Sequence, residues 1–529
     1  MPSLVFLGLT LPWLNPVTWG PMSGALPLWF SWVCATVALG LIAAAPARWS
    51  AGQLMRVAAG AWLAAALGSV FIGLLQYVGA AEWLGGWVSP TPLGVAFANL
   101  RQRNQFAGLT SLGLVALLWW VTYQAALQAS SKLNELTLNG STSPLALLPL
   151  GNACRPQAGL HLAGTLGAAI LLGVGNAASS SRTGLMQLVL IAGLAVVWGG
   201  LHQPAVRRTM LVAGLAYGLA SIALPWLAGL DPFGSGAWAR LRDGDSACAS
   251  RLTLWGNVLH LIAQKPWLGW GWGELDYAHF ITLYPGERFC DILDNAHNLP
   301  LHLAVELGVP AAVLLCGVVV VAVWRAKPWR EADPLRQLAW AVLAVIGLHS
   351  LLEYPLWYGP FQVAFGLCGG FLWRTRARAG HPGPPTGLPN RPPAGLDPNL
   401  KPFSPLAGVS IALIAIPLIV LGGYVTWDYY RVSQVYLSPA KRLAAYRENT
   451  LAKIQGSVLF KQQVRFAELT TTPLTPANAA HIHRLALALL HFSPEPRVIE
   501  KLIDSAELLG RPTEAAFYRM RLEAAFARQ

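Results

Sequence analysis

A histidine followed by a polar helix face is the first candidate for catalysis in this sequence. His297 lies within Asp294–Asn298, directly before a long apolar segment. Free histidine has a pKa of roughly 6.5 and can act as a general base at neutral pH, although a capping or interfacial histidine is the alternative. Asn298, His302 and Glu306 recur every four residues and so share one helix face, where they either link helices or orient His297.

Arginines form the second candidate group. Arg101, Arg103, Arg182 and Arg251 lie at or near the ends of predicted helices. The guanidinium group is permanently charged, and its planar fork of donors suits phosphate oxygens. For a single such arginine, snorkelling or contact with lipid headgroups is the better explanation. Several at one membrane face favour an anionic ligand, such as a lipid-linked phosphate or diphosphate.

Tryptophans alternate with glycines in the segment Lys265–Gly273. Trp267, Trp270 and Trp272 either form part of an interfacial aromatic belt or offer flat faces against which sugar rings stack. Further polar residues occur in Asn99–Asn104, Ser179–Gly184 and His349–Tyr358.

Composition indicates that membrane helices position these residues. Only 12% of the 529 residues are charged and 54% are hydrophobic, whereas soluble domains are roughly a quarter charged. This excludes a soluble globular protein and a disordered chain, and it argues against nucleic-acid binding as the reason for the net charge of +13. The last 105 residues hold 23 of the charged residues and the first 424 hold 38, which indicates a membrane domain (1–424) and a tail (425–529).

Apolar runs of about 20 residues, the length that crosses a bilayer as a helix, predict an all-α polytopic membrane protein. We expect about eleven transmembrane helices, at 3–19, 24–45, 57–80, 104–128, 159–178, 184–201, 209–229, 299–324, 335–352, 356–373 and 406–424.

The distribution of lysine and arginine predicts the orientation of these helices. With the N-terminus inside, the inner loops carry fifteen Lys and Arg and the short outer loops carry three. We therefore expect a cytoplasmic N-terminus and, outside, the loop 230–298 together with the C-terminal tail. All candidate site residues then gather at the outer face.

Three further features concern the inner linker, the tail and the cysteines. The Pro/Gly-rich stretch 375–404 predicts a linker without a packed core. In the tail, the sequence around Gly510–Pro512 predicts two antiparallel helices, similar to a tetratricopeptide hairpin, although a generic helical tail explains it equally. Cys248 and Cys290 share the outer loop, which is compatible with a disulfide.

Asp243 and Asp245 form a D-x-D pair, a pattern that holds a divalent cation in some glycosyltransferases. Nucleotide sugars are cytoplasmic, whereas this loop is predicted to be outside. We therefore expect no metal and no cofactor.

Four segments, taken in order, resemble the O-antigen ligase/polymerase superfamily. They are Ser250–Gly273 and Asp294–Pro310, together with 99–108 and 349–358, which resemble the bacterial protein O-oligosaccharyltransferases that glycosylate pilins. Arg101 and Arg103 depart from the pattern, in which less basic residues flank the glutamine.

The resemblance implies transfer of an oligosaccharide en bloc from undecaprenyl diphosphate to Ser or Thr hydroxyls of exported proteins such as pilins, at the periplasmic face of a bacterial inner membrane. It implies His297 as the base and Arg251 with Arg182 as the groups that stabilise the leaving diphosphate. The implied substrate-binding residues are Arg101, Arg103, Asn104, Trp267, Trp270, Trp272, Asn298, His349, Glu353 and Tyr354.

Other functions remain open at this point. An O-antigen ligase acting on lipid A-core, or an O-antigen polymerase, shares the same site and differs in the acceptor. A transporter of lipid-linked glycan is more remote, because the polar residues gather at one face and no internal repeat is visible.

Overall fold

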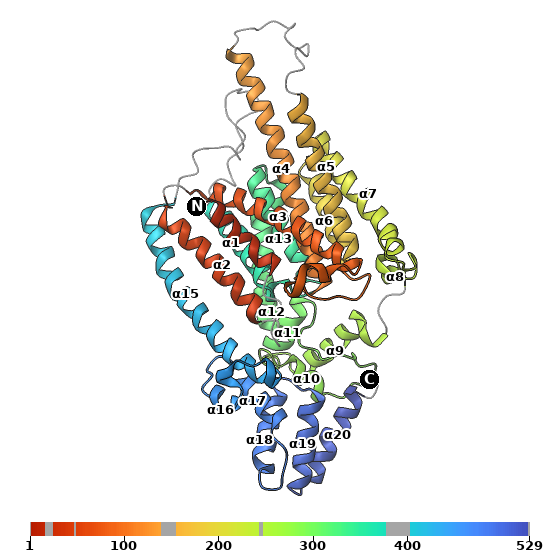
Figure 1. Cartoon of the computed structure of the whole chain (residues 1–529). Coiled ribbons are helices and arrows are strands. Elements are labelled where there is room, and N and C mark those ends of the chain that lie inside the picture. The colour runs from red at the N-terminus through yellow and green to blue at the C-terminus, as the bar shows by residue number, and fades with distance from the viewer. Residues whose placement is uncertain are drawn as a thin grey trace.

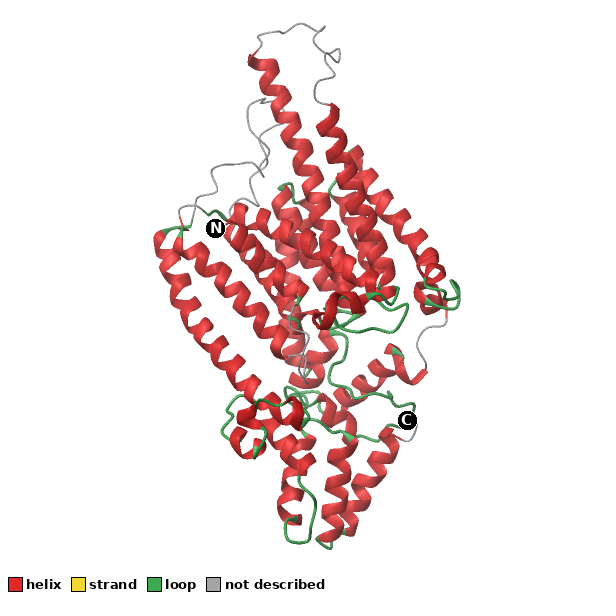
Figure 2. Ribbon diagram, viewed as in Figure 1, coloured by secondary structure: helices red, strands yellow, loops and turns green. Residues whose placement is uncertain are grey.

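The computed structural model describes residues 2–15, 25–46, 49–138, 155–242, 247–376 and 403–526. Within these ranges the chain is helical, with no strand (Figure 2). The all-α prediction is confirmed, and six of the described helices are long and apolar enough to cross a membrane.

A bundle of long helices forms the larger part of the molecule (Figure 1). Its helices are α1 (Pro2–Leu14), α2 (Ala25–Ala44), α3 (Ala51–Tyr77), α4 (Arg103–Leu138), α5 (Arg155–Ala178), α6 (Arg182–Val197), α7 (Pro204–Leu227), α12 (Val309–Ala326), α13 (Pro334–Ser350), α14 (Gly359–Arg374) and α15 (Pro405–Ser433). Each predicted span overlaps one of these helices, and the number of actual membrane crossings stays a prediction.

Two of the predicted spans differ from the helices in the structure. The first, 3–19, contains only the 13 residues of α1. The eighth, 299–324, is divided at Gly308 into α11 (Leu299–Leu307) and α12. Gly308 has φ +87°, and a Cβ there would lie 2.1 Å from the carbonyl oxygen of Trp267. Only glycine permits both this conformation and this approach, so the apolar run continues while the helix does not.

Close approach of helices holds the bundle core together. A Cβ added to Gly175 of α5 would lie 2.2 Å from Cγ2 of Val70 in α3, so the side chain of Val70 packs directly on the backbone of α5. Packing of this kind stabilises helices in lipid, where burial from water contributes little. Trp62, Phe106 and Phe361 are fully buried in the same core.

Three short helices lie between the bundle and the tail: α8 (Gly236–Arg242), α9 (Arg251–Gln264) and α10 (Leu275–Ile281). They belong to the segment 230–298, which was predicted as the large outer loop, and Figure 1 places this segment at the end of the bundle that faces the tail.

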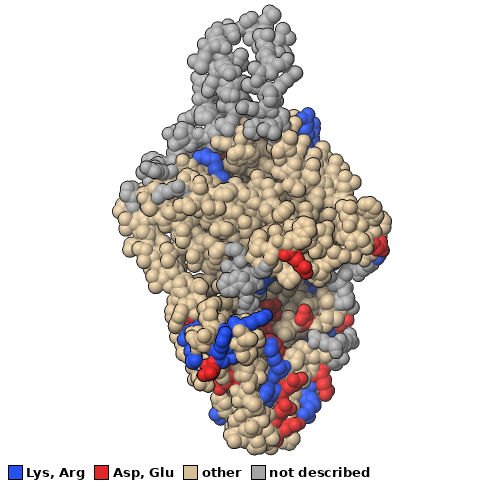
Figure 3. Space-filling view, in the orientation of Figure 1, with Lys and Arg blue, Asp and Glu red and all other residues tan. Residues whose placement is uncertain are grey.

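The tail consists of α16 (Thr450–Ile454), α17 (Lys461–Thr471), α18 (Ala479–Leu490), α19 (Pro496–Leu508) and α20 (Pro512–Phe526). The predicted hairpin around Gly510 is confirmed as α19 and α20. Charged side chains gather on the tail, while the surface over the bundle is mostly uncharged (Figure 3).

The tail packs directly on α10. Tyr277, Phe280 and Ile281 join the apolar core of the tail helices. His491 stacks on Tyr277 with ring centroids 3.9 Å apart, and its Nδ1 lies 2.6 Å from Oε2 of Glu274. Arg521 of α20 donates to the carbonyl oxygen of Ile281 (2.8 Å). The tail and the loop around α10 therefore form one packed unit.

Candidate active site

The carboxylate of Glu353 is the centre of the candidate site. It lies between α13 and α14, and its side chain is 4% exposed. Oε1 accepts hydrogen bonds from Asn104 (2.7 Å) and from Nη2 of Arg251, and Oε2 accepts from Gln102 (3.0 Å). Nδ1 of His297 lies 2.8 Å from the same Oε2. Residues from three distant segments thus meet at the carboxylate of Glu353.

Glu353 is ionised in this environment. Burial alone raises the pKa of its carboxyl, but the hydrogen bond and charge of His297 and the charge of Arg251 outweigh burial and lower the pKa to about 2. A buried carboxylate with this number of donors is stabilised in its charged form.

His297 is held in one orientation by its neighbours. Its backbone has φ +51°, a strained value for a residue with a side chain, and its N–H donates to Oδ1 of Asn295 (2.9 Å). The ring contacts Tyr354 edge to face, with centroids 5.0 Å apart. The bond from Nδ1 to Glu353 directs Nε2 away from the carboxylate, and the side chain is 25% exposed.

Helix caps position three of the candidate residues. Ser181 caps α6 and Ser250 caps α9, so Arg182 and Arg251 are the first residues of their helices. Asn298 caps α11, directly after His297, and its Nδ2 donates to the carbonyl oxygen of Leu351 (3.0 Å). This bond joins the start of α11 to the segment that carries Glu353.

The four arginines differ in how they reach the site. Arg251 contacts Glu353 directly. Arg182 follows Ser181, whose hydroxyl donates to Oδ1 of Asn104 (2.5 Å). Arg101 and Arg103 flank Gln102, are half-buried, and Arg101 adopts φ +60°. Arg251 therefore brings positive charge directly to the carboxylate, whereas the segments that carry Arg101, Arg103 and Arg182 reach the site through Gln102, Asn104 and Ser181.

A disulfide joins the start of α9 to the segment before His297. Cys248 and Cys290 are bonded, with Cα atoms 5.2 Å apart, and the backbone N–H of Cys290 donates to the carbonyl oxygen of Cys248 (3.2 Å). The disulfide with which the sequence was compatible is therefore present in the structure. Arg251 lies three residues after one cysteine and His297 seven residues after the other, so the bond restricts both sides of the site.

The three tryptophans of the predicted sugar-binding segment lie in different environments. Trp272 is 63% exposed and stacks on Trp357 with centroids 6.2 Å apart. Trp270 donates from its indole to the carbonyl oxygen of Leu261 (3.0 Å) and packs under Lys265. Trp267 is 76% exposed next to the start of α12. Of the three tryptophans, Trp272 is linked to His297 by aromatic contacts. It stacks on Trp357, which contacts Tyr354, and Tyr354 contacts His297.

The polar stripe on α11 has two separate roles. His302 and Glu306 are buried with 3.5 Å between Nε2 and Oε2, and the ring of His302 contacts Trp272 and Trp357. The backbone N–H of Gly271 donates to the carbonyl oxygen of Glu306 (3.0 Å). His302 and Glu306 thus fix the tryptophan segment on α11, while Asn298 caps the helix.

His349 is buried near the site but makes no side-chain contact with Glu353. Neither ring nitrogen has a hydrogen-bond partner in the described part of the chain, and the ring contacts Phe361 edge to face at 5.5 Å. Its carbonyl oxygen accepts the backbone N–H of Glu353 (2.8 Å), so His349 supports the backbone of that residue.

Three residues at the site were not singled out from the sequence. Gln102 binds Glu353, Ser181 binds Asn104, and Trp357 stacks on Trp272. All three lie in the polar segments Asn99–Asn104, Ser179–Gly184 and His349–Tyr358. Their position in these segments is the only feature of the sequence that indicated them.

The described residues contain no group of three or more His, Cys, Asp or Glu side chains that could hold a metal ion. Asp243 and Asp245 lie outside the described residues, so the weak D-x-D hypothesis stays untested.

Comparison with known families gives three matches along the chain. The model of the O-antigen ligase family matches residues 167–316, and that of the protein glycosylation ligases matches residues 96–121. The C-terminal model of virulence factor membrane-bound polymerases matches residues 337–529. No solved structure matches significantly.

Two curated relatives come from Acinetobacter baylyi. A general O-oligosaccharyltransferase is 29% identical over 132 residues, which cover 24% of this chain and 22% of the relative. A ComP-specific O-oligosaccharyltransferase is 23% identical over 282 residues, which cover 52% of this chain and 44% of the relative. The aligned parts thus span less than half of each relative. Parts of the chain are thus similar to the O-antigen ligases and to the bacterial protein O-oligosaccharyltransferases, as its motifs indicated.

Proposed function

We propose that this protein transfers an oligosaccharide from undecaprenyl diphosphate to a Ser or Thr hydroxyl of an exported protein, at the periplasmic face of the inner membrane. The observation that carries the proposal is the convergence of His297, Arg251 and Asn104 on the buried carboxylate of Glu353.

His297 is the proposed general base. Glu353 is ionised, so Nδ1 of His297 carries the proton of their hydrogen bond, and the lone pair of Nε2 faces the acceptor hydroxyl. As the hydroxyl oxygen bonds to the anomeric carbon, its proton passes to Nε2. Glu353 stabilises the imidazolium that forms, as a carboxylate does in other His–carboxylate pairs.

Arg251 and Arg182 are the proposed stabilisers of the leaving group. The bond between the anomeric carbon and the diphosphate oxygen breaks, and undecaprenyl diphosphate leaves with the electron pair. Only Nη2 of Arg251 is engaged by Glu353, and a guanidinium group has five N–H donors in all. Arginines fixed at helix starts are oriented before the reaction, which is the most effective form of electrostatic stabilisation.

The proposed sugar contact is the exposed face of Trp272 beside Trp357. Stacking on an indole leaves the sugar's hydroxyl groups in water, which suits a long glycan that must be held near one end only. The relatives named as O-oligosaccharyltransferases favour a protein acceptor. A ligase for lipid A-core and an O-antigen polymerase are the alternatives, because the O-antigen ligase model covers the same loop.

The test is transfer in vitro by the purified full chain. Undecaprenyl-diphosphate oligosaccharide is incubated with a pilin-like protein or with lipid A-core, and the glycosylated product is measured by mass spectrometry. We expect glycan on the protein, and His297→Ala is expected to lower the rate about 10³-fold, within the range for loss of a general base. Glycan on lipid A-core alone would overturn the protein acceptor, and full activity of the variant would remove the base assignment.

A further inference from the structure

A cavity lies at the end of the bundle opposite to the candidate active site. It has a volume of about 100 Å³, is lined by α4, α6, α7 and α13, and is partly open to the surface. Pro334 and Gln337 of α13 line it, whereas Ser350 at the other end of the same helix adjoins the Glu353 segment. At about 1.5 Å per residue, the two places are roughly 20 Å apart. The cavity is therefore separate from the site of chemistry.

The walls of this cavity change from apolar to polar along the helix axes. The deep part is lined by Val115, Ile191 and Ala341, all buried. The outer part is lined by Thr122 and Gln337, which are half-buried, and by Gln203, which is exposed. An occupant must have a hydrocarbon part that points into the bundle and a polar part at the surface.

One buried polar group in the wall has no partner. Trp119 is 5% exposed and lines the cavity, and no acceptor for its indole N–H is present among the described residues. A buried donor without an acceptor costs on the order of 1–3 kcal/mol. An acceptor on the occupant, at the level between the apolar and polar parts, removes this cost.

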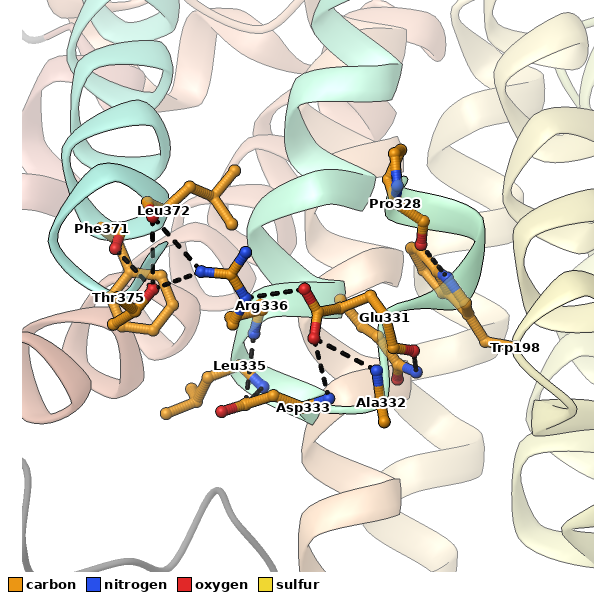
Figure 4. Close-up of polar contacts among 11 residues, drawn as sticks. Trp198, Pro328, Glu331, Ala332, Asp333, Leu335, Arg336, Phe371, Leu372 and Thr375 are labelled. Atoms are coloured by element: carbon orange, nitrogen blue, oxygen red, sulfur yellow. Dashed lines mark hydrogen bonds and ion pairs between the residues drawn. The ribbon is translucent and has the colours of Figure 1, made fainter. Parts of the chain in front are cut away.

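The walls of the cavity are fixed independently of any occupant. The indole of Trp198 donates to the carbonyl oxygen of Pro328 (2.8 Å), which joins α6 to the turn before α13. Figure 4 shows this bond beside Arg336, whose guanidinium contacts Glu331 and Thr375 and joins α13 to α14. A cavity with such walls persists in the absence of a ligand.

We propose that this cavity binds one acyl chain of an anionic phospholipid from the leaflet at this end of the bundle. The chain fills the apolar part, the ester carbonyl accepts the hydrogen bond of Trp119, and the headgroup lies at Gln203. Arg207 and Arg208, both exposed in the first turn of α7, supply positive charge beside the mouth. The polarity order is that of a lipid in this leaflet, with its head at the surface and its chain toward the midplane.

The volume supports this occupant over a glycan or a nucleotide. An apolar cavity of about 150 Å³ holds one benzene molecule, so about 100 Å³ accommodates a segment of hydrocarbon chain, and its apolar deep part offers no polar partners to a glycan or a nucleotide. The surrounding bilayer supplies such chains at high concentration.

The experiment measures phosphatidylglycerol retained by the purified full chain, with lipid extraction and mass spectrometry after exchange into detergent. Trp119→Phe keeps an aromatic side chain but removes the N–H together with the five-membered ring of the indole. Loss of a hydrogen bond worth about 1 kcal/mol corresponds to about fivefold weaker retention. Trp120→Phe is the matched control, because this neighbour is 41% exposed and does not line the cavity.

A second pair of variants tests occupancy by volume. Ala195→Leu fills the cavity and is expected to abolish retention, whereas Ala322→Leu on the exposed surface of α12 is expected to have no effect. Unchanged retention in both Trp119→Phe and Ala195→Leu overturns the proposal. Equal retention of phosphatidylcholine overturns the role of the arginines, and retention of a polyprenyl lipid in place of phospholipid overturns the identity of the occupant.

Discussion

Two buried Arg–Glu pairs lie at opposite ends of the bundle, and they differ in what else reaches them. Arg336 and Glu331 are 3% and 9% exposed, and Arg336 makes further bonds to Thr375 and the backbone of Leu372. Glu353 is equally buried, but Arg251 and His297, which bind it, are each 25% exposed. The first pair is closed and joins helices. The second pair is open to solvent, because the side chains of Arg251 and His297 are partly exposed.

This difference separates a structural ion pair from the proposed catalytic one within a single protein. Both need partners, because an isolated charge at this depth is costly. Only an open pair can also present a charged donor and a base to a substrate. The contrast leads to predictions in which the same chemical change has different effects at the two ends.

The largest contrast is expected for Glu353→Gln against Glu331→Gln. Both changes keep the shape of the side chain and remove its charge. Glu353→Gln is expected to lower glycan transfer about 10²- to 10³-fold, because the amide neither orients His297 nor stabilises its protonated form. Glu331→Gln is expected to leave the rate per folded molecule unchanged.

Thermal unfolding in detergent gives the second measurement on these two variants. Glu331→Gln leaves Arg336 buried without its carboxylate, which costs on the order of 3 kcal/mol, and a lowered melting temperature is expected. A large loss of transfer in a stable Glu331→Gln protein would contradict the distinction between the two pairs.

The pH dependence of stability sharpens the comparison. The pKa of Glu353 is about 2 in the folded protein against an ordinary value of 4.5. Because the pKa is lower in the folded state, the ionised group adds stability that is full above about 4.5 and is lost as the pH falls toward 2. This contribution is on the order of 3 kcal/mol.

Denaturant titrations between pH 6 and pH 2.5 measure this contribution. The parent protein is expected to lose stability over this range by more than Glu353→Gln does. Parallel curves for the two proteins would show that the carboxylate is not held ionised by His297 and Arg251.

A smaller effect is expected from the disulfide that restrains the open pair. The double variant Cys248→Ser, Cys290→Ser frees the start of α9 relative to the segment before His297. We expect transfer to fall about tenfold, since misplacement of a catalytic group by about 1 Å costs up to about 10²-fold. Single replacement of Cys316, which is outside the disulfide, is the control. If the double variant had the kinetics of the parent protein, the disulfide would not be needed to position Arg251.

The smallest effect is expected at the aromatic residues beside the open pair. Trp272→Ala removes the indole that stacks on Trp357 and is expected to raise KM for the lipid-linked donor about fivefold with little change in kcat. Trp267→Ala, at a similarly exposed position away from that stack, is expected to leave both constants unchanged. Equal effects of the two variants would mean that the whole segment, and not one ring, contacts the glycan.

Much of the fold follows from the sequence because apolar runs long enough to cross a bilayer have few structural alternatives. The break at Gly308 could not be predicted in this way, because hydropathy continues across it and the turn depends on contact with Trp267. The segments of the site were identifiable from polar residues beside apolar helices. The central role of Glu353 was not, because it arises where residues 102, 104, 251 and 297 meet. The different orientations of Trp267, Trp270 and Trp272 depend on a loop backbone that carries no periodic signal.

The packing of α10 against the tail has a consequence for the order of assembly. Tyr277, Phe280 and Ile281 are covered by helices that leave the ribosome some two hundred residues later. Contacts of such large sequence separation form late in folding. The loop that carries Arg251 and His297 therefore completes its packing only after the tail has folded, so a chain interrupted after α15 exposes an apolar face there. The proposed catalytic centre is therefore expected to complete its packing only after the tail has been synthesised.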